Sequence, residues 1–266
     1  MIELKNVSKY YGGVAAVENI SVKLQNGRIY AVVGPDGAGK STLLGLLAGS
    51  LEPDEGTVKI NGFDMSREPL SARQCVGYLP KDALPYGDMT PLEYLLFVAE
   101  ARGLSYGRSV RRANDALELA GLEREKDRLI SSLSSGMRRR LAVVQAAVGK
   151  NDILILDAPT AELDIRRSAE VLELIRELAQ GKTVILSCRD PKEALGIGEH
   201  ILLLSNGKLV ASQAVEDAAG DLEERFRLLK EENAPVSPVR RKRLVPERDG
   251  EYEVIDTDEE RGGDGQ

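Results

Sequence analysis

The sequence predicts an α/β fold with an N-terminal antiparallel β-subdomain, a core built on a mixed or parallel sheet, and an inserted helical subdomain. Three segments of different character support this prediction. Residues 1–80 are rich in strands and turns, residues 81–148 have the pattern of helices, and residues 151–212 alternate strands with helices. Apolar strands separated by helices are typical of a parallel sheet that is covered on both faces. Because the helical block lies between two halves of that sheet, we expect it to form an inserted lobe.

Short strands and glycine turns alternate in the N-terminal segment. Apolar and polar residues alternate at 20–24, and an apolar run follows at 29–33. Between them lies Asn26-Gly27, a dipeptide that favours a hairpin turn. Another short strand is predicted at 57–60, ended by Asn61-Gly62. This pattern indicates the antiparallel subdomain.

The middle segment contains a clear helix start. Thr90 is expected to cap the helix, Pro91 to occupy its first position, and Glu93 to reach back to the cap. A second helix is predicted at 109–120 and is ended by Gly121. These helices form the predicted lobe.

Strands and helices alternate again after residue 150. The helix expected at 166–179 ends before Gly181, and Asn206-Gly207 is expected to form a turn between two strands. The strands of this segment are short and apolar, and they are predicted at 153–156, 183–187, 201–204 and 209–211.

Composition indicates a globular protein and excludes some functions. Of the 266 residues, 42% are hydrophobic and 30% are charged. The net charge of −7 argues against a nucleic-acid partner, because such binding usually needs a basic surface. No apolar run is long enough to span a bilayer, and the first residues have no secretory pattern. We therefore expect a cytoplasmic protein that reaches the inner face of the cell membrane only through a partner.

The character of the chain changes again near the C-terminus. A helical extension is expected at 216–232, after a main domain at 1–215. From residue 233 onward, prolines, a basic run at 240–243 and an acidic run at 256–260 leave few apolar groups to bury. This composition predicts a disordered charged tail at 233–266.

A glycine-rich segment between an apolar strand and a helix has the pattern G-x-x-x-x-G-K-S. Glycines at these positions let consecutive backbone N–H groups point inward at an anion, and the following helix N-terminus adds its positive dipole end. In such a P-loop, the lysine bridges the outer phosphates and the serine hydroxyl is a Mg²⁺ ligand. The pattern predicts the core of a P-loop NTPase. The residues expected to bind nucleotide are Gly34, Pro35, Asp36, Gly37, Ala38, Gly39, Lys40, Ser41 and Thr42.

A carboxylate follows the predicted strand at 153–156. Asp157 therefore emerges at the carboxyl edge of the sheet, which is where open α/β sheets bind their ligands. A carboxylate at that edge completes the shell of a Mg²⁺ ion, directly or through water. The sequence thus predicts a metal site formed by Ser41 and Asp157.

Over residues 1–215, the chain resembles the ABC ATPase family, because several features occur in that family's order. Tyr11 stands where the family has an aromatic residue that stacks on adenine, and the P-loop follows. The resemblance implies ATP and Mg²⁺ as cofactors. The remaining matches are a signature-like Leu133-Ser134-Ser135-Gly136-Met137, the strand and carboxylate at 153–157, and a D-loop-like Ala161-Glu162-Leu163-Asp164.

The resemblance also implies a head-to-tail dimer, in which each ATP lies between the P-loop of one chain and the signature of the other. Ser134, Ser135, Gly136 and Met137 would then contact the ATP of a partner. The Ser134 hydroxyl, the small Gly136 and a helix N-terminus suit contact with a γ-phosphate. Ser135 stands where the family has its first signature glycine.

Three positions depart from the family pattern, and all belong to the machinery of hydrolysis. Ala158 stands where the family has a glutamate that polarises the attacking water, Lys81 replaces a glutamine, and Arg189 replaces a histidine. The only histidine, His200, lies one strand further along and is expected at a sheet edge. Glu162 is displaced along its loop and is a poor replacement for the missing base. These departures predict weak or absent hydrolysis and leave enzymatic activity open.

Two of the departures add positive charge. Lys81 and Arg189 are expected near the γ-phosphate, where they would bind ATP tightly and release it slowly. The alternative is that both side chains point into solvent.

Two functions agree with these features. The first is the ATP-binding subunit of an ABC transporter, which forms a homodimer or a heterodimer with another ABC ATPase subunit and acts on a separate multi-span permease. The second is an ATP-gated regulatory or assembly protein of the same family, without transport.

Overall fold

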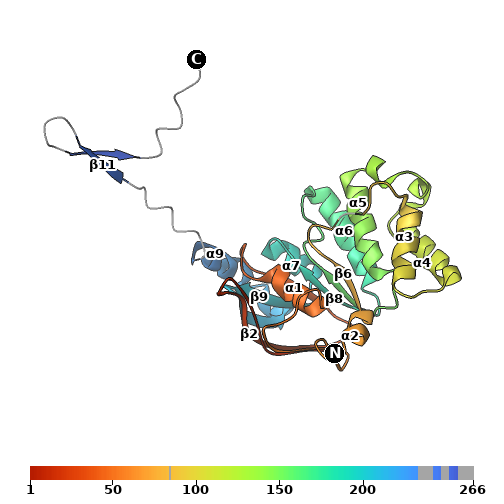
Figure 1. Ribbon diagram of the computed structural model, residues 1–266, viewed down its shortest axis with the longest axis horizontal. Coiled ribbons are helices and arrows are strands. Elements are labelled where there is room, and N and C mark those ends of the chain that lie inside the picture. Colours follow the sequence, from red (N-terminus) through yellow and green to blue (C-terminus); the bar gives the residue numbers. More distant parts are fainter. Residues whose placement is uncertain (84, 233–241, 247–251, 257–266) are drawn as a thin grey trace, which may run out of the picture.

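The computed structural model describes residues 1–83 and 85–232, and the backbone of 242–246 and 252–256. Its main body contains two sheets (Figure 1). The first has four strands in the order β2-β1-β4-β5 and is antiparallel. It confirms the predicted N-terminal β-subdomain. Its strands are β1 (Ile2–Tyr11), β2 (Val14–Leu24), β4 (Glu55–Ile60) and β5 (Phe63–Asp64).

The second sheet has six strands in the order β10-β9-β3-β8-β7-β6. Every neighbouring pair is parallel except β9 and β10, so this mixed sheet is the predicted core. Its strands are β3 (Ile29–Val33), β6 (Val76–Leu79), β7 (Ile153–Leu156), β8 (Thr183–Ser187), β9 (His200–Ser205) and β10 (Lys208–Ala214).

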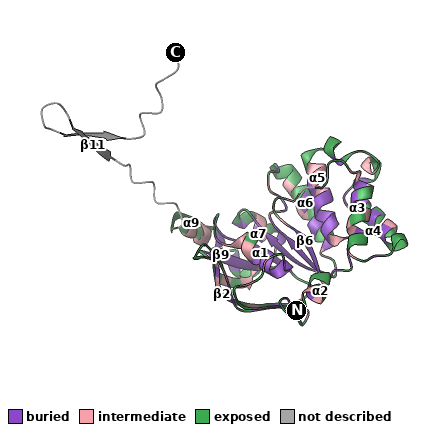
Figure 2. Ribbon diagram, viewed as in Figure 1, coloured by how far each residue is buried: buried purple, intermediate pink, exposed green. Residues whose placement is uncertain are grey.

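Both faces of the core sheet are buried, as Figure 2 shows for its central strands. On one face lies α1 (Lys40–Ala48), packed between the two sheets in a shared apolar cluster. On the other face, a second cluster joins the sheet to the lobe and to α6 (Ile165–Leu178) and α7 (Pro191–Ile197). Alternate residues of each strand enter the two clusters, because side chains along a strand point to opposite faces. This explains the continuous apolar runs of the sequence.

The helical lobe is inserted in the sequence between β6 and β7, which are adjacent strands of the core sheet. β6 and β7 pair in parallel, and the chain between them forms the lobe, which confirms the predicted insertion. The Thr90–Glu93 capping box is present at the start of α3. The lobe contains α3 (Pro91–Ala101), α4 (Tyr106–Leu119), η1 (Glu123–Glu125), η2 (Ile130–Ser132) and α5 (Ser135–Ala147).

Several elements differ from those predicted. Asn26-Gly27 does form a turn, but it joins β2 to β3, which belong to different sheets, so it is not a hairpin. The turn sequence fixes only the local reversal, whereas strand pairing depends on distant residues. The helix α4 begins at Tyr106, three residues before the predicted start. The sequence pattern does not predict α7 or the short α2 (Pro69–Gln74), and both are present.

The C-terminal part of the body is helical and comprises α8 (Val215–Ala218) and α9 (Leu222–Glu232), and α9 packs on α7. Within the segment predicted to be disordered, the backbone is described for β11 (Lys242–Pro246) and β12 (Tyr252–Asp256), which pair antiparallel. The rest of that prediction lies outside the described residues. Across the described chain, no helix has the length and apolarity needed to cross a membrane.

Gly77 on β6 allows α5 to pack closely against the core sheet. A Cβ atom added there would lie 1.9 Å from the carbonyl oxygen of Ala146, in the backbone of the α5 helix. We expect Gly77→Ala to lower the free energy of unfolding by at least about 2 kcal/mol, because neither backbone segment is free to move away. Urea denaturation of the full chain measures the change.

Gly107→Ala is the matched control. Gly107 lies in α4, and an added Cβ would meet no atom within 4 Å. Its free energy of unfolding should stay the same or rise by up to about 1 kcal/mol, because alanine favours a helix. Equal stabilities for the two variants would contradict the close approach of α5 to β6.

Candidate nucleotide-binding site

The glycine-rich loop runs from the end of β3 to the start of α1. Gly37 and Gly39 have φ angles of +80° and +98°, in the left-handed region that favours glycine. The helix begins at Lys40, and its first turn is closed by a hydrogen bond of 2.9 Å from Leu43 N–H to the Gly39 carbonyl. The loop thus delivers backbone N–H groups and a helix N-terminus to one place, as the P-loop pattern predicted.

Glycines in this loop also permit close packing. A Cβ atom on Gly39 would lie 2.2 Å from the Ala16 carbonyl oxygen of β2. One on Gly34 would lie 2.3 Å from the Leu204 carbonyl oxygen of β9. The loop is therefore pressed against both sheets, a contact that sequence analysis did not predict.

Lys40 lies over the loop. Its Nζ donates to the carbonyl oxygens of Gly34 at 2.6 Å and Pro35 at 2.9 Å. Burial lowers the pKa of the ammonium group below its ordinary value, while the carboxylates of Asp36 and Asp157 act in the opposite direction. The charge of Lys81 adds to the lowering. Lys40 is thus a partly buried cation within electrostatic range of both Asp157 and Lys81.

One cavity of about 420 Å³ brings the predicted site together. It contains most of the P-loop, the metal-site residues and all three positions that depart from the family pattern. Its lining is Ala16, Asp36, Gly37, Ala38, Gly39, Lys40, Ser41, Thr42, Lys81, Asp157, Ala158, Ala161, Ser187, Cys188 and Arg189.

Other predicted residues lie outside this cavity. Gly34 and Pro35 form the buried start of the loop. Tyr11 ends β1 with a side chain 49% exposed, so it is available for stacking but does not line the cavity. His200 begins β9, which pairs with β10 and β3 and is therefore not the edge strand that was expected; its Nε2 is 3.0 Å from the Ser212 Oγ of β10. Glu162 is exposed and also lies away from the cavity lining.

Asp157 is held by a hydroxyl group that sequence analysis missed. The Ser187 hydroxyl donates to Asp157 Oδ1 at 2.6 Å, and the backbone N–H of Ala158 donates to the same Ser187 Oγ at 2.7 Å. Asp157 is only 2% exposed, so this support fixes a nearly buried carboxylate. Ser187 ends β8 as Asp157 follows β7, and a polar residue at the end of a buried strand was the signal available.

The donor set fits a magnesium ion bound together with nucleotide. The Ser41 hydroxyl and the Asp157 carboxylate line the same cavity, and both are oxygen ligands of the kind that Mg²⁺ prefers. Among the described residues, no group of three or more His, Cys, Asp or Glu side chains is arranged to hold a metal. A Mg²⁺ ion held by Ser41 and Asp157 would take its remaining ligands from phosphate oxygens and water.

Arg189 is attached to the α7 helix through its backbone. The Glu193 carboxylate accepts from the backbone N–H of Arg189 at 2.9 Å and also from the Thr160 hydroxyl. This link joins the loop after β8 to the loop after β7. It leaves the guanidinium of Arg189 exposed at the cavity, with no ion pair among the described residues.

The signature residues lie at the start of α5, apart from the cavity. Ser134 caps the helix by accepting from the backbone N–H of Met137 at 3.2 Å. Ser135 accepts from Arg167 Nη1 at 3.3 Å, and the same arginine passes close to Gly136. Ser134 and Ser135 are exposed. Within one chain, therefore, the signature does not contact its own P-loop.

Comparisons with known proteins agree with this geometry. The model of the ABC transporter family matches residues 17–161. The linearmycin resistance ATP-binding protein LnrL of Bacillus subtilis (strain 168) is 33% identical over 79% of this chain and 68% of its own length. The daunorubicin/doxorubicin resistance ATP-binding protein DrrA of Streptomyces peucetius is 34% identical over 83% of this chain and 66% of its own length. The chain thus aligns with about two thirds of each relative.

Solved structures give the same result. A dimeric ATP-binding cassette, MJ0796, in a post-hydrolysis state bound to ADP and Pi superposes with a TM-score of 0.73 and 27% identity. The match covers 81% of this chain and 99% of that cassette.

The hydrogen bond from Ser187 to Asp157 generates a prediction for stability. We expect Ser187→Ala to lower the free energy of unfolding by about 1–3 kcal/mol, because it leaves a buried carboxylate without its donor and the N–H of Ala158 without its acceptor. Ser131→Ala removes an exposed hydroxyl from η2 and should change stability by less than about 0.5 kcal/mol. Urea denaturation of both variants makes the comparison, and a Ser187→Ala variant as stable as the parent would contradict the assigned role.

Proposed function

The chain belongs to the ABC transporter family, and we propose that it is an ATP-binding subunit whose own site holds ATP but hydrolyses it slowly or not at all. One observation carries the second half of this proposal. Ala158 stands where the family has its catalytic glutamate, and it lines the cavity directly after Asp157. The P-loop of the same cavity is complete. A methyl group takes no proton from water.

No other side chain in the cavity replaces the missing base. Asp36 and Asp157 are the only carboxylates in its lining. Asp157 is buried, hydrogen-bonded and assigned to the metal, while Asp36 lies on the exposed part of the loop. A general base contributes about 10²–10⁴-fold to a rate, which corresponds to roughly 3–5 kcal/mol of barrier. Its loss slows turnover severely and leaves binding of the triphosphate intact.

Lys81 and Arg189 support slow release of ATP. Both line the cavity with Lys40, and charge-assisted contacts to phosphate are stronger than neutral ones. Their exposure agrees with the alternative that they point into solvent, but their place in the cavity lining favours contact with the outer phosphate. Removing both charges should therefore weaken ATP binding.

The separation of signature and P-loop supports a dimer. Ser134 and Gly136 present a helix N-terminus on a surface away from the cavity, where a second chain is needed to place nucleotide against it. Ser135, which stands where the family has its first signature glycine, is already hydrogen-bonded to Arg167. A nearly complete signature, in a chain whose own site lacks the catalytic base, favours a heterodimer with another ABC ATPase subunit.

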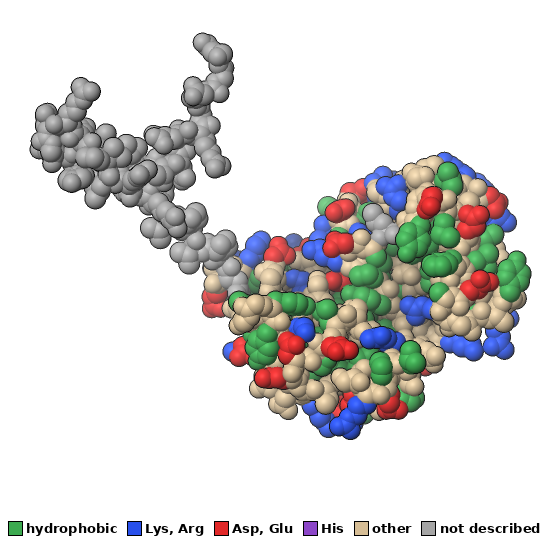
Figure 3. All heavy atoms as spheres, in the orientation of Figure 1, with side chains coloured by type: hydrophobic (Ala, Val, Ile, Leu, Met, Phe, Trp, Pro, Cys, Tyr) green, Lys and Arg blue, Asp and Glu red, His purple; other side chains and the backbone are tan. Residues whose placement is uncertain are grey.

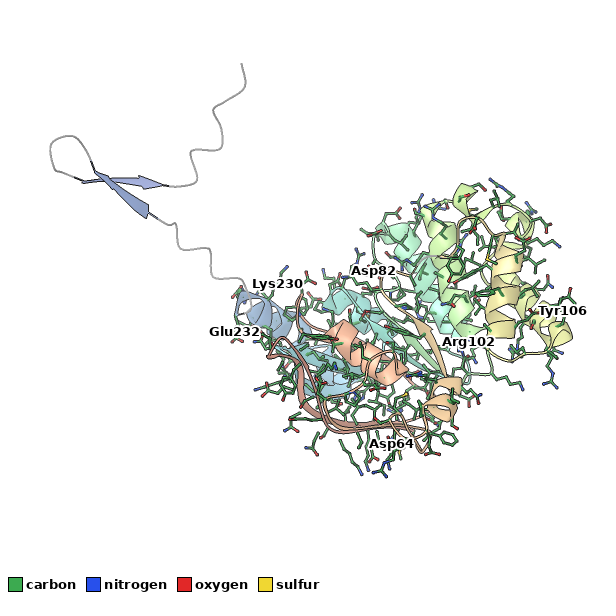
Figure 4. All side chains as sticks on the ribbon, in the orientation of Figure 1. Asp64, Asp82, Arg102, Tyr106, Lys230 and Glu232 are labelled. Atoms are coloured by element: carbon green, nitrogen blue, oxygen red, sulfur yellow. The ribbon has the colours of Figure 1, made fainter. Side chains whose placement is uncertain are left out.

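A groove between the lobe and the core supports a membrane partner. It has a volume of about 560 Å³ and lies where α3 of the lobe meets β6 and the end of α1. Phe97 lines it and is 50% exposed, and Arg102 stands at the same junction (Figure 4). Hydrophobic side chains gather on this side of the molecule (Figure 3). Exposed apolar surface rimmed by charge is typical of a protein interface, so we propose that a multi-span permease binds here at the inner face of the membrane.

The proposed loss of hydrolysis is tested on the purified full chain. We expect ATP binding with a turnover far below about 1 s⁻¹, the lower end of the ordinary range for enzymes. Lys40→Ala should abolish binding, since it removes the ammonium from the phosphate site. Equilibrium dialysis with labelled ATP and phosphate release measure the two quantities. A turnover near 1 s⁻¹ that Lys40→Ala abolishes would overturn the proposal.

The membrane partner is tested by fractionating native cells. The chain should sediment with membranes, and Phe97→Asp should release most of it, because a charge replaces the apolar side chain of the groove. Val14→Asp is the matched control, since Val14 is an exposed apolar residue on β2, outside the groove. A chain found only as a soluble ATP-dependent dimer would instead support the regulatory function.

A further inference from the structure

We propose that Glu193 is a positioning residue of the nucleotide site: it holds the backbone of Arg189 at the cavity and ties it to the loop that carries Ala158, so that the site prefers ATP to ADP. Glu193 itself lies outside the lining of the cavity. This role rests on the proposed function, because it requires a cavity that binds ATP. It adds a residue that acts through Arg189 and makes no contact with nucleotide of its own.

The side chain of Glu193 joins two loops of the core. One carboxylate oxygen accepts from the backbone N–H of Arg189 at 2.9 Å, in the loop after β8. The other accepts from the hydroxyl of Thr160, in the loop after β7. Thr160 is only 1% exposed and Glu193 is half-buried, so water is largely kept from the bond between them. A hydrogen bond to a carboxylate in such surroundings is stronger than one between neutral groups.

This use of Glu193 differs from an ordinary helix cap. Asp190 caps α7 by accepting from the backbone N–H of Glu193 at 2.9 Å. In a capping box, the glutamate would in turn accept from the N–H of the cap residue, as Glu93 does for Thr90 at the start of α3. Glu193 instead bonds to the residue before the cap and to a second loop. Its carboxylate therefore connects the loops and does not close the helix.

Arg189 lies between two links of this kind. Two residues before it, the Ser187 hydroxyl donates to Asp157 and accepts from the Ala158 N–H. On its other side, Glu193 holds its backbone N–H. The guanidinium remains exposed at the cavity, without an ion pair in the described part of the chain. A side chain whose backbone is already fixed loses less freedom on binding, which strengthens a contact that only the third phosphate of ATP offers.

The charge of Glu193 gives the opposite expectation. Removing a carboxylate from the neighbourhood of the cavity lowers its repulsion of phosphate, and this effect is larger for ATP than for ADP because ATP carries more negative charge. Charge alone therefore predicts tighter ATP binding when Glu193 is neutralised. The loss of positioning predicts weaker binding, so the sign of the change in ATP affinity separates the two.

Isothermal titration of the full chain with ATP and with ADP, both with Mg²⁺, measures the effect. For Glu193→Ala, we expect the affinity for ATP to fall at least about tenfold and that for ADP less than about threefold. Glu193→Gln should stay within about threefold of the parent for both nucleotides, because its amide oxygen can accept from Arg189 and its amide N–H can donate to the hydroxyl of Thr160.

Thr160→Val tests the link between the loops separately. It removes the hydroxyl and leaves the bond from Arg189 to Glu193 in place, so ATP affinity should fall by about three- to tenfold with little change for ADP. This variant and Glu193→Gln still decide the question if Glu193→Ala does not fold. A Thr160→Val chain that binds both nucleotides as the parent does would contradict the link.

A double variant shows whether Glu193 acts through Arg189. In a chain that already carries Arg189→Gln, Glu193→Ala should lower ATP affinity by less than about twofold, because no guanidinium is left to position. An equal loss with and without the guanidinium would overturn the role.

Glu93→Ala is the matched control. It removes the glutamate of the capping box of α3, outside the cavity, and takes away one negative charge as Glu193→Ala does. Its affinities for ATP and ADP should equal those of the parent. The control separates the link between the loops from the general effect of a weakened helix cap.

Failure of this role and failure of the proposed function give different results. If Glu193→Ala binds ATP as tightly as the parent or more tightly, Glu193 does not position Arg189, and the proposed function stands. Equal losses for ATP and ADP also contradict the role, since they indicate damage to the whole site. If the parent binds no ATP, the proposed function itself fails.

Discussion

The parallel register of the core strands is the constraint on which the site depends. Leu79 pairs with Leu156, and Leu156 pairs with Leu186, so β6, β7 and β8 end in one row. Because parallel strands in register end at the same edge, residues that follow different strands lie close together there even when they are far apart in sequence. The bond between Ser187 and Asp157 joins the residue that ends β8 to the one that follows β7. The buried apolar clusters on both faces hold this register, since a slip by one residue would turn every strand side chain to the opposite cluster.

The backbone at position 158, where the family has its catalytic glutamate, is held in place whichever side chain it carries. Ala158 keeps a φ of +47°, a left-handed conformation uncommon for alanine, and its backbone N–H is held by Ser187. The loop after β7 is therefore shaped by backbone contacts and does not require a carboxylate at this position. Substitution there removes a proton acceptor while leaving Asp157 and the cradle in place. This geometry agrees with the proposal that the site binds ATP and hydrolyses it slowly or not at all.

Two kinds of feature could be predicted from the sequence: those set by neighbouring residues, and those set by the ends of buried strands. The Thr90–Glu93 capping box was identified because its residues lie within one helical turn. The cavity brings Lys81, Asp157 and Arg189 together because each follows a buried strand. Features that depend on strand pairing could not be predicted in this way. The Asn26-Gly27 turn does not reveal that its flanking strands enter different sheets, and nothing local to Gly39 indicates the carbonyl of Ala16 against it.

The position of the signature limits how such a chain works in a dimer. Ser134 caps α5 on the lobe, and α5 also packs against β6 and β7, so the signature begins a helix that contacts the sheet that carries the P-loop. In the head-to-tail dimer that we propose, a chain of this design would contribute two halves to two different nucleotide sites. In a homodimer, both sites would contain Ala158 and both would lack a base. In a heterodimer, this chain's signature would complete a site whose P-loop and base belong to the partner, while its own cavity would keep a second ATP in place. In that proposed heterodimer, Ala158 would remove one hydrolytic site and leave the other in place. The P-loop of this chain would then serve to bind ATP, and its signature would serve the site of the partner.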